Sequence, residues 1–140
     1  MFTLDTNIIS ELMRDHPHPA VLDWLDARLM RELIVKAVTE AEVYTGLAFL
    51  PLGKRRRRFT EAADHVFASL FKGRILPFDS NAARFYVESV AACRAAGRPI
   101  SQSDDQISAI VQSRGMVLVT RNVQDFEDMG IGVYNPWDAT

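Results

Sequence analysis

The chain has 140 residues, of which 48% are hydrophobic and 24% charged, values that exclude a disordered, collagen-like or coiled-coil protein. Its 16 Lys and Arg against 18 Asp and Glu give a net charge of −2, which argues against nucleic-acid binding by positive charge alone. A single cysteine, Cys93, excludes an intrachain disulfide and a thiolate zinc cluster. We expect one cytoplasmic domain over residues 1–140, without a signal peptide or the roughly 20 apolar residues of a membrane span.

Short apolar runs alternate with longer amphipathic stretches along the whole chain. The candidate strands are 2–4, 33–38, 75–78, 116–119 and 132–134. The candidate helices are 7–14, 19–30, 40–50, 55–72, 80–96, 104–114 and 123–128. This alternation predicts an α/β fold in which helices cover both faces of a mostly parallel sheet.

Acidic or amide side chains recur where these strands end. Asp5 follows the first strand, Glu42 lies shortly after the second, Asp79 ends the third and Asn122 follows the fourth, while Asp104 opens a helix. The carboxyl ends of parallel strands share one edge of the sheet, so these side chains can converge there. Clustered carboxylates bind Mg²⁺ or Mn²⁺, which can orient a water and stabilise charge on a phosphoryl oxygen. The pattern indicates hydrolysis of a phosphate ester.

Most of these residues also have a purely structural interpretation. Asp5 and Asp79 both suit the N-cap of the helix that follows them. The segments Thr39–Glu42 and Ser101–Asp104 both fit the capping box, with Asp in place of Glu in the second. The single sequence leaves both interpretations open, because only convergence at one edge separates them.

Four segments carry a family resemblance: Leu4–Asn7, Thr39–Glu42, Asp104–Ala109 and Leu118–Asn122. In their order and spacing the chain resembles the PIN-domain ribonucleases over essentially its whole length. More narrowly, it resembles the VapC/FitB-type toxins of type II toxin–antitoxin systems. The resemblance implies a three-layer α/β/α sandwich with a central sheet of four to five strands. It also implies an endoribonuclease that depends on Mg²⁺ or Mn²⁺, an RNA substrate, a small DNA-binding antitoxin as partner, and a homodimer.

The resemblance also assigns roles to residues of this chain. The catalytic positions are Asp5, Glu42, Asp104 and Asn122, and the first three are the metal ligands. Asp5 and Asp104 would hold the ion at the scissile phosphate, and Glu42 would position the attacking water. Some family members carry a fourth acid where this chain has Asn122, so we expect one tightly held metal. The residues expected to support these side chains through hydrogen bonds are Thr6, Asn7 and Thr120.

The basic residues suggest contacts with RNA phosphates. Arg121 follows the fourth strand next to the predicted site, and Arg55 and Arg56 belong to the basic run Lys54–Arg58. That run is equally consistent with the solvated start of a helix or with an acidic partner. By the resemblance, the apolar helical stretch 41–71 contributes to a groove that binds the antitoxin.

Two other functions compete with this hypothesis. A haloacid-dehalogenase-type phosphatase also places Asp after its first strand, but it needs a second Asp where this chain has Asn7. A PIN-fold RNA-binding or protein-interaction module with weak or no catalysis is kept open by Asn122.

We interpret Asp125 as a first-turn acid favoured by the helix dipole. We interpret His16 and His18 as residues of a surface loop, and Cys93 as a small apolar packing residue.

Overall fold

The sheet of the computed structural model has the predicted α/β organisation. The structure describes residues 1–138, so the last two residues of the expected domain lie outside the described part. Five strands lie in the order β3-β2-β1-β4-β5, and every neighbouring pair is parallel. The strands are β1 (Phe2–Leu4), β2 (Leu33–Lys36), β3 (Ile75–Leu76), β4 (Val117–Val119) and β5 (Gly132–Tyr134). The predicted fold class is therefore confirmed.

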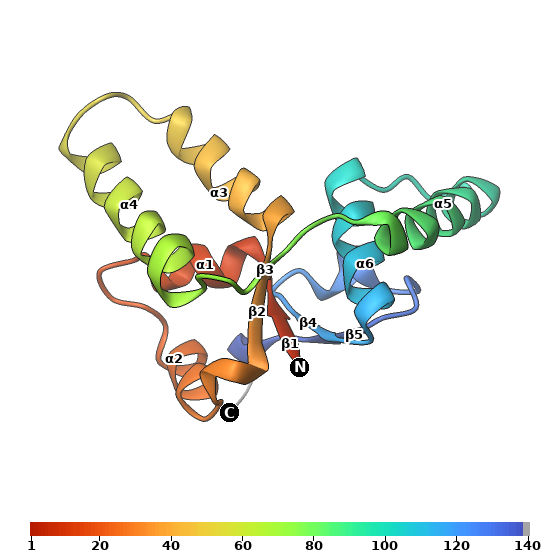
Figure 1. Cartoon of the computed structure of the whole chain (residues 1–140), viewed down its shortest axis with the longest axis horizontal. Helices are drawn as coiled ribbons and strands as arrows, with labels where there is room; N and C mark the ends of the chain where they lie inside the picture. The colour runs from red at the N-terminus through yellow and green to blue at the C-terminus, as the bar shows by residue number, and fades with distance from the viewer. Residues whose placement is uncertain (139–140) are drawn as a thin grey trace.

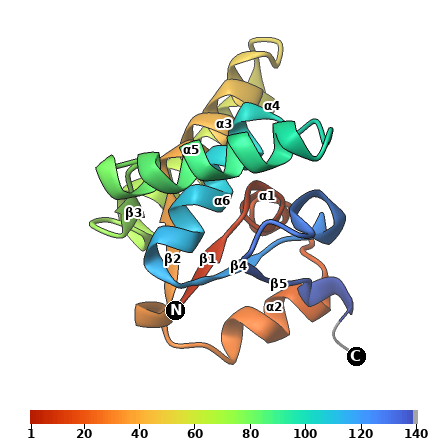
Figure 2. The same cartoon turned by 90° about the vertical axis from the view of Figure 1, so that its right-hand side faces the viewer.

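Six α-helices surround this sheet in layers. They are α1 (Thr6–Leu12), α2 (Pro19–Asp26), α3 (Ala37–Ala48), α4 (Lys54–Asp64), α5 (Ser80–Ala95) and α6 (Gln102–Arg114). Helices α1, α3 and α4 lie on one side of the strands and α5 and α6 on the other (Figure 1). Turning the molecule shows α5 crossing over α6, with α2 at the opposite end of the strands (Figure 2). None of the helices within residues 1–138 is long and apolar enough to cross a membrane.

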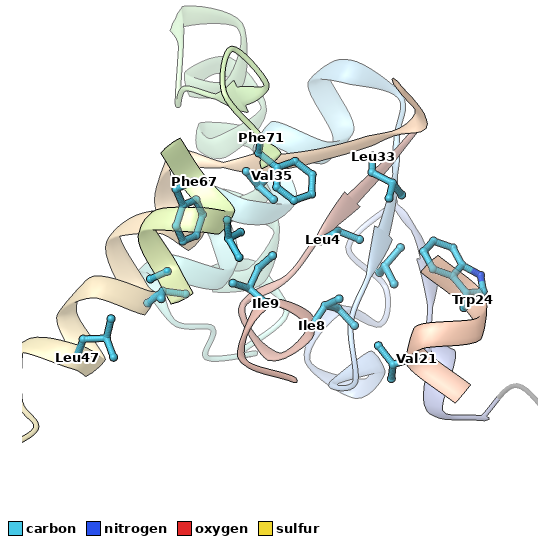
Figure 3. Close-up of a cluster of buried hydrophobic side chains, with 14 residues drawn as sticks. Leu4, Ile8, Ile9, Val21, Trp24, Leu33, Val35, Leu47, Phe67 and Phe71 are labelled. Carbon is cyan, nitrogen blue, oxygen red and sulfur yellow. The ribbon is translucent and has the colours of Figure 1, made fainter. Parts of the chain in front are cut away.

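The two faces of the sheet bury separate apolar clusters. Leu4, Leu33 and Val35 pack with residues of α1 to α4 in the larger cluster, which Figure 3 shows. Leu118 packs with Ile107 of α6 in the smaller cluster on the other face. Because successive side chains of a strand point to opposite faces, β2 and β4 each contribute to both clusters. Burial on both faces explains why the strands read as apolar runs.

Several element boundaries differ from the sequence predictions; the third strand, for example, ends at Leu76 rather than at residue 78. The second strand ends at Lys36 rather than at residue 38, and α3 begins at once with Ala37. The predicted helix 19–30 ends at Asp26 and is followed by a 3₁₀ turn, η1 (Met30–Glu32). The predicted helix 55–72 divides into α4 and a π-helical segment, η2 (His65–Leu70). The predicted helix 123–128 is a short 3₁₀ helix, η3 (Val123–Phe126). A further 3₁₀ turn, η4 (Pro136–Asp138), follows β5.

The parallel ladders continue just past the strands and set the positions of two polar side chains. The backbone N–H of Asp5 donates to the carbonyl of Val119 at 2.9 Å, and that of Thr120 donates to the carbonyl of Tyr134 at 2.9 Å. Asp5 and Thr120 are therefore neighbours on adjacent strands at the carboxyl edge of the sheet. This edge carries the site described next.

Candidate active site

The three predicted acids line one cleft at the carboxyl edge of the sheet. The cleft has a volume of about 490 Å³, and its walls come from β1, α1, α3, α6 and the segment after β4. The lining includes Asp5, Glu42, Asp104, Arg121, Asn122 and Trp137. Residues as far apart in sequence as Asp5 and Asn122 thus share one solvent-facing cavity, as the parallel topology requires.

Asp5 occupies the N-cap position of α1 but does not act as a side-chain cap. Its backbone is extended there, and its carboxylate makes no hydrogen bond to the first turn of the helix. Instead, Asp5 Oδ2 accepts a 2.8 Å hydrogen bond from the Thr120 hydroxyl. Only 6% of Asp5 is exposed. The carboxylate is thus held by tertiary structure, which excludes the simple capping interpretation.

Thr120 connects this carboxylate to the rest of the cleft. Its buried hydroxyl donates to Asp5 and accepts from Asn7 Nδ2 and from the backbone N–H of Asn122, both at 3.1 Å. Asn7 Oδ1 in turn accepts from the backbone N–H of Arg121 at 3.1 Å. One network thus links the end of β1, the start of α1 and the segment after β4.

The capping-box interpretation of Glu42 is wrong. Helix α3 begins at Ala37 with Lys36 as its N-cap, so Thr39 and Glu42 both lie inside the helix. Thr39 is fully buried. The Glu42 side chain reaches α1, where Oε1 accepts a 3.0 Å hydrogen bond from the Thr6 hydroxyl. Sequence reasoning misjudged this position because Lys36–Val38 extends the apolar pattern of the strand into the first turn of the helix.

Asp104 lies in the first turn of α6, where the predicted cap is confirmed. Ser101 is the N-cap, and its hydroxyl accepts from the backbone N–H of Asp104 at 3.1 Å. Burial raises the pKa of the half-buried Asp104 carboxyl, and the nearby carboxylates, first that of Asp125 and then those of Asp5 and Glu42, raise it further. The neighbouring negative charges therefore disfavour the charged form of Asp104.

Two further acids have structural roles. The neighbouring Asp105 is 3% exposed and accepts a 2.7 Å hydrogen bond from Ser89 of α5. Asp105 therefore does not line the cleft, whereas Asp104 does. Asp79 caps α5 as expected: its Oδ1 accepts from the backbone N–H of Ala82 at 2.9 Å, and this bond lowers its pKa.

The donor set of the cleft suits a hard divalent cation. Among residues 1–138 there is no group of three or more Asp, Glu, His or Cys side chains arranged closely enough to hold an ion by themselves. Mg²⁺, however, is usually bound through one or two carboxylates and keeps several waters, so a complete protein cage is not required. The carboxylates of Asp5 and Glu42 both raise the pKa of Asp104, so negative charge is concentrated in the cleft. A bound cation would offset that charge.

A cationic group that the sequence analysis missed lies beside these acids. Lys36 is fully buried at the end of β2, and its ammonium donates to the Leu4 carbonyl at 3.0 Å and to the Thr3 hydroxyl at 3.2 Å. Burial lowers its pKa to about 8, while attraction to Asp5 and Glu42 opposes that shift. A lysine inside the apolar run 33–38 was the signal that could have identified it.

Arg121 is the predicted RNA-binding residue that the structure brings to the cleft. Its guanidinium carbon lies 5.0 Å from the centre of the Trp137 ring, and both side chains line the cavity. This cation–π contact fixes an exposed arginine at the rim. Trp137 was not among the predicted site residues.

The basic run lies elsewhere, at the start of α4. Arg56 donates to the Leu50 carbonyl at 3.4 Å, Arg55 packs over the ring of Phe59, and Arg58 pairs with Asp15 at 3.3 Å. In the described chain none of the residues 54–58 lines the acidic cleft. Any contact of this run with RNA would therefore be remote from the carboxylates.

The remaining candidates have other environments. His18 caps α2 by accepting from the backbone N–H of Ala20 at 3.1 Å, and His16 is exposed. Cys93 contacts the sulfur of Met129 at 3.9 Å. Asp125 is exposed and lines a neighbouring cavity of about 310 Å³ that shares Asp104 with the cleft.

Comparison with known proteins gives consistent results. The family model described as PIN domain matches residues 2–131. The chain is 39% identical over 138 residues to VapC ribonuclease Y4jK of Sinorhizobium fredii, covering 99% of each chain. It is 34% identical over 137 residues to Toxin FitB of Neisseria gonorrhoeae, covering 98% of this chain and 99% of that one. The solved structure of FitAB bound to a DNA fragment superposes with a TM-score of 0.90 at 34% identity, covering 100% of this chain and 98% of that one.

Proposed function

The chain belongs to the PIN-domain family and is a VapC-type ribonuclease toxin of a type II toxin–antitoxin system, and from this premise we propose how it cleaves RNA. Asp5 and Asp104 would hold one Mg²⁺ or Mn²⁺ ion directly and Glu42 would contact it through a water, and the protein hydrolyses phosphodiester bonds as an endoribonuclease. The observation that carries the proposal is the position of these three carboxylates on the wall of one cleft. Asn122, also on that wall, adds a neutral amide and no fourth charge.

The divalent ion supplies positive charge at the scissile phosphate and lowers the pKa of water near it. Asp5 and Asp104 are its ligands. Thr120 orients Asp5 through the 2.8 Å hydrogen bond, and Ser101 positions the first turn of α6 that carries Asp104. These residues assemble the ligand set before the substrate arrives, which reduces the cost of reorganisation during the reaction.

Glu42 is the residue that prepares the attacking water. The Thr6 hydroxyl fixes the Oε1 atom of Glu42 at 3.0 Å, so Oε2 can accept the proton as the water attacks phosphorus. The new P–O bond forms from that water, one ester P–O bond of the RNA breaks, and the departing ribose oxygen takes a proton from solvent. With Glu42 in this role, no histidine is needed as a general base.

Arg121 binds a phosphate of the RNA next to the scissile one. Stacking on Trp137 presents the guanidinium at the mouth of the cleft, where its N–H groups can bind a phosphate in a bidentate manner. Arg55 and Arg56 contribute a second, remote contact to the RNA backbone. Although its net charge is negative, the protein thus binds RNA through a metal ion and a few arginines rather than through a broad basic surface.

The protein partner is an antitoxin that is a small DNA-binding protein. An apolar groove of about 430 Å³ lies between α1, α3 and α4, and its lining includes Met13, Val43, Leu47, Leu50 and Phe59. The groove adjoins the acidic cleft, since Thr6 and Glu42 line both. An antitoxin segment seated there would block access to Glu42. The related FitAB assembly has been solved on DNA, which supports this type of partner. We also propose a homodimer.

A cleavage assay tests the proposal. Purified protein, Glu42→Gln and Asp5→Asn are incubated with a labelled pool of cellular RNA at graded Mg²⁺ or Mn²⁺ concentrations, and with EDTA. Glu40→Gln on the same helix is the matched control. We expect metal-dependent cutting by the wild type and the control, and at least a hundredfold loss in the two site variants. Cutting that survives both EDTA and Asp5→Asn would refute the mechanism. RNA binding without cutting by the wild type would favour a non-catalytic binding module instead.

A further inference from the structure

The side chain of Lys36 is fully buried next to the acidic cleft. It is held by two neutral oxygens, the Leu4 carbonyl and the Thr3 hydroxyl, both in β1. Leu4 directly precedes Asp5, so the lysine contacts the backbone that carries this carboxylate. A buried charged group is costly unless nearby groups of opposite charge stabilise it. The carboxylates that do so here are those of Asp5 and Glu42.

The ammonium keeps its charge at neutral pH. Its pKa of about 8 lies above 7, so the protonated form predominates at neutral pH. The three carboxylates of the proposed metal site, Asp5, Glu42 and Asp104, and the Lys36 ammonium together carry two negative charges. One divalent ion neutralises that set, whereas a second ion would leave it with a net charge of +2.

We propose that Lys36 is a built-in counter-ion that limits the site to one divalent metal and moderates its affinity. It is a positioning residue: it acts on Asp5 and Glu42 through the electrostatic field and through the backbone at Leu4. This inference depends on the metal site proposed above, and it explains a charge that catalysis itself does not use. A purely structural lysine would instead support the site, and its loss would weaken metal binding.

Mn²⁺ binding to the metal-free protein, measured by calorimetry and by electron paramagnetic resonance of free Mn²⁺, tests the role of Lys36. The variants are Lys36→Met, which is apolar, and Lys36→Gln, which is neutral but can still donate a hydrogen bond to Leu4. Lys72→Met, at an exposed position, is the matched control. Circular dichroism establishes that each variant is folded.

We expect the wild type and Lys72→Met to bind one Mn²⁺ with equal affinity. Both Lys36 variants should bind the first ion about tenfold more tightly and take up a second at millimolar Mn²⁺, because a positive charge near the ligands has been removed. Because both variants remove the charge, one of them still tests the proposal if the other does not fold.

Two results would overturn the inference alone. These are unchanged or weaker Mn²⁺ binding in both Lys36 variants, and two ions already bound to the wild type. A structural role would be recognised by weaker binding in Lys36→Met and wild-type binding in Lys36→Gln. If neither the wild type nor the variants bind Mn²⁺, the metal site of the proposed function fails as well, so the two failures are distinguishable.

Discussion

Replacing Thr120 by valine removes one oxygen atom from the centre of the site and leaves the shape of the side chain nearly unchanged. That oxygen donates to Asp5 at 2.8 Å and accepts from Asn7 and from the backbone of Asn122, each at 3.1 Å. Thr120 is fully buried and Asp5 is 6% exposed, so water cannot readily replace the bond between them.

The expected loss of stability follows from these three contacts. A hydrogen bond to a buried charged group contributes about 1.5–3 kcal/mol, and leaving the carboxylate without its donor forfeits that amount. Asn7 and Asn122 face the cleft and can bind water instead, so their two bonds add about 0.5 kcal/mol each. We expect Thr120→Val to lower the free energy of unfolding by about 3 kcal/mol. Cleavage should fall about 10- to 100-fold, as for other residues that orient metal ligands.

Urea denaturation of the metal-free protein followed by circular dichroism measures the stability change, and the RNA assay measures the activity. Thr45→Val makes the same substitution at an exposed position of α3 and should change stability by less than about 0.5 kcal/mol. A double-mutant cycle with Asp5→Asn isolates the contact and should give a coupling of about 1.5–3 kcal/mol. If Thr120→Val resembles Thr45→Val in stability and cuts RNA normally, Thr120 does not hold Asp5 as argued.

Three further predictions concern other parts of the molecule. Burial and the hydrogen bond to Asp64 raise the pKa of Tyr44 to about 12, so the folded protein retains this proton longer than the unfolded chain does. Stability should therefore fall as the pH rises from about 10 to about 12, and Tyr44→Phe should flatten that fall in urea titrations at several pH values. Gly115 ends α6 with a φ of 62°, so Gly115→Ala should cost about 1 kcal/mol in thermal unfolding, and an unchanged Tm would contradict this. Arg121→Met should weaken RNA binding and reduce the salt slope of log Kd by about one, whereas an equal slope would show that the guanidinium stacked on Trp137 does not bind a phosphate.

The segment from Lys36 to Glu42 shows where local sequence signals become ambiguous. Leu33–Val38 is apolar except for one lysine, so hydrophobicity alone does not reveal that the helix begins at Ala37. Thr39 and Glu42 have the spacing of a capping box, yet both lie inside the helix. The side chain of Glu42 reaches Thr6 because α3 packs against α1. Capping motifs depend on residue types within four positions, and the same types can serve contacts between helices.

The acids of α6 illustrate the opposite case. Ser101 was expected to cap this helix from its sequence alone, and its hydroxyl does so. Asp104 is the acid that the family resemblance assigns to the site, and the structure excludes its neighbour from that role, since Asp105 is buried against Ser89. Helical geometry separates adjacent residues by about 100°, so only one of the two can face the cleft.

The sequence by itself determined the α/β class, the parallel sheet and the caps of α5 and α6, and its resemblance to the PIN-domain family indicated Asp5, Glu42 and Asp104. The class, the sheet and the caps follow from the periodicity of apolar residues and from local hydrogen bonding, which depend on near neighbours in the chain. Only the tertiary structure decided that Asp5 bonds to Thr120, that Glu42 bonds to Thr6, and that the ammonium of Lys36 lies beneath them. Those contacts join residues 32 to 115 positions apart, and they form because the parallel strands bring their carboxyl ends to one edge. The net charge of −2 describes the whole chain, whereas the chemistry of the cleft depends on where a few of those charges are placed.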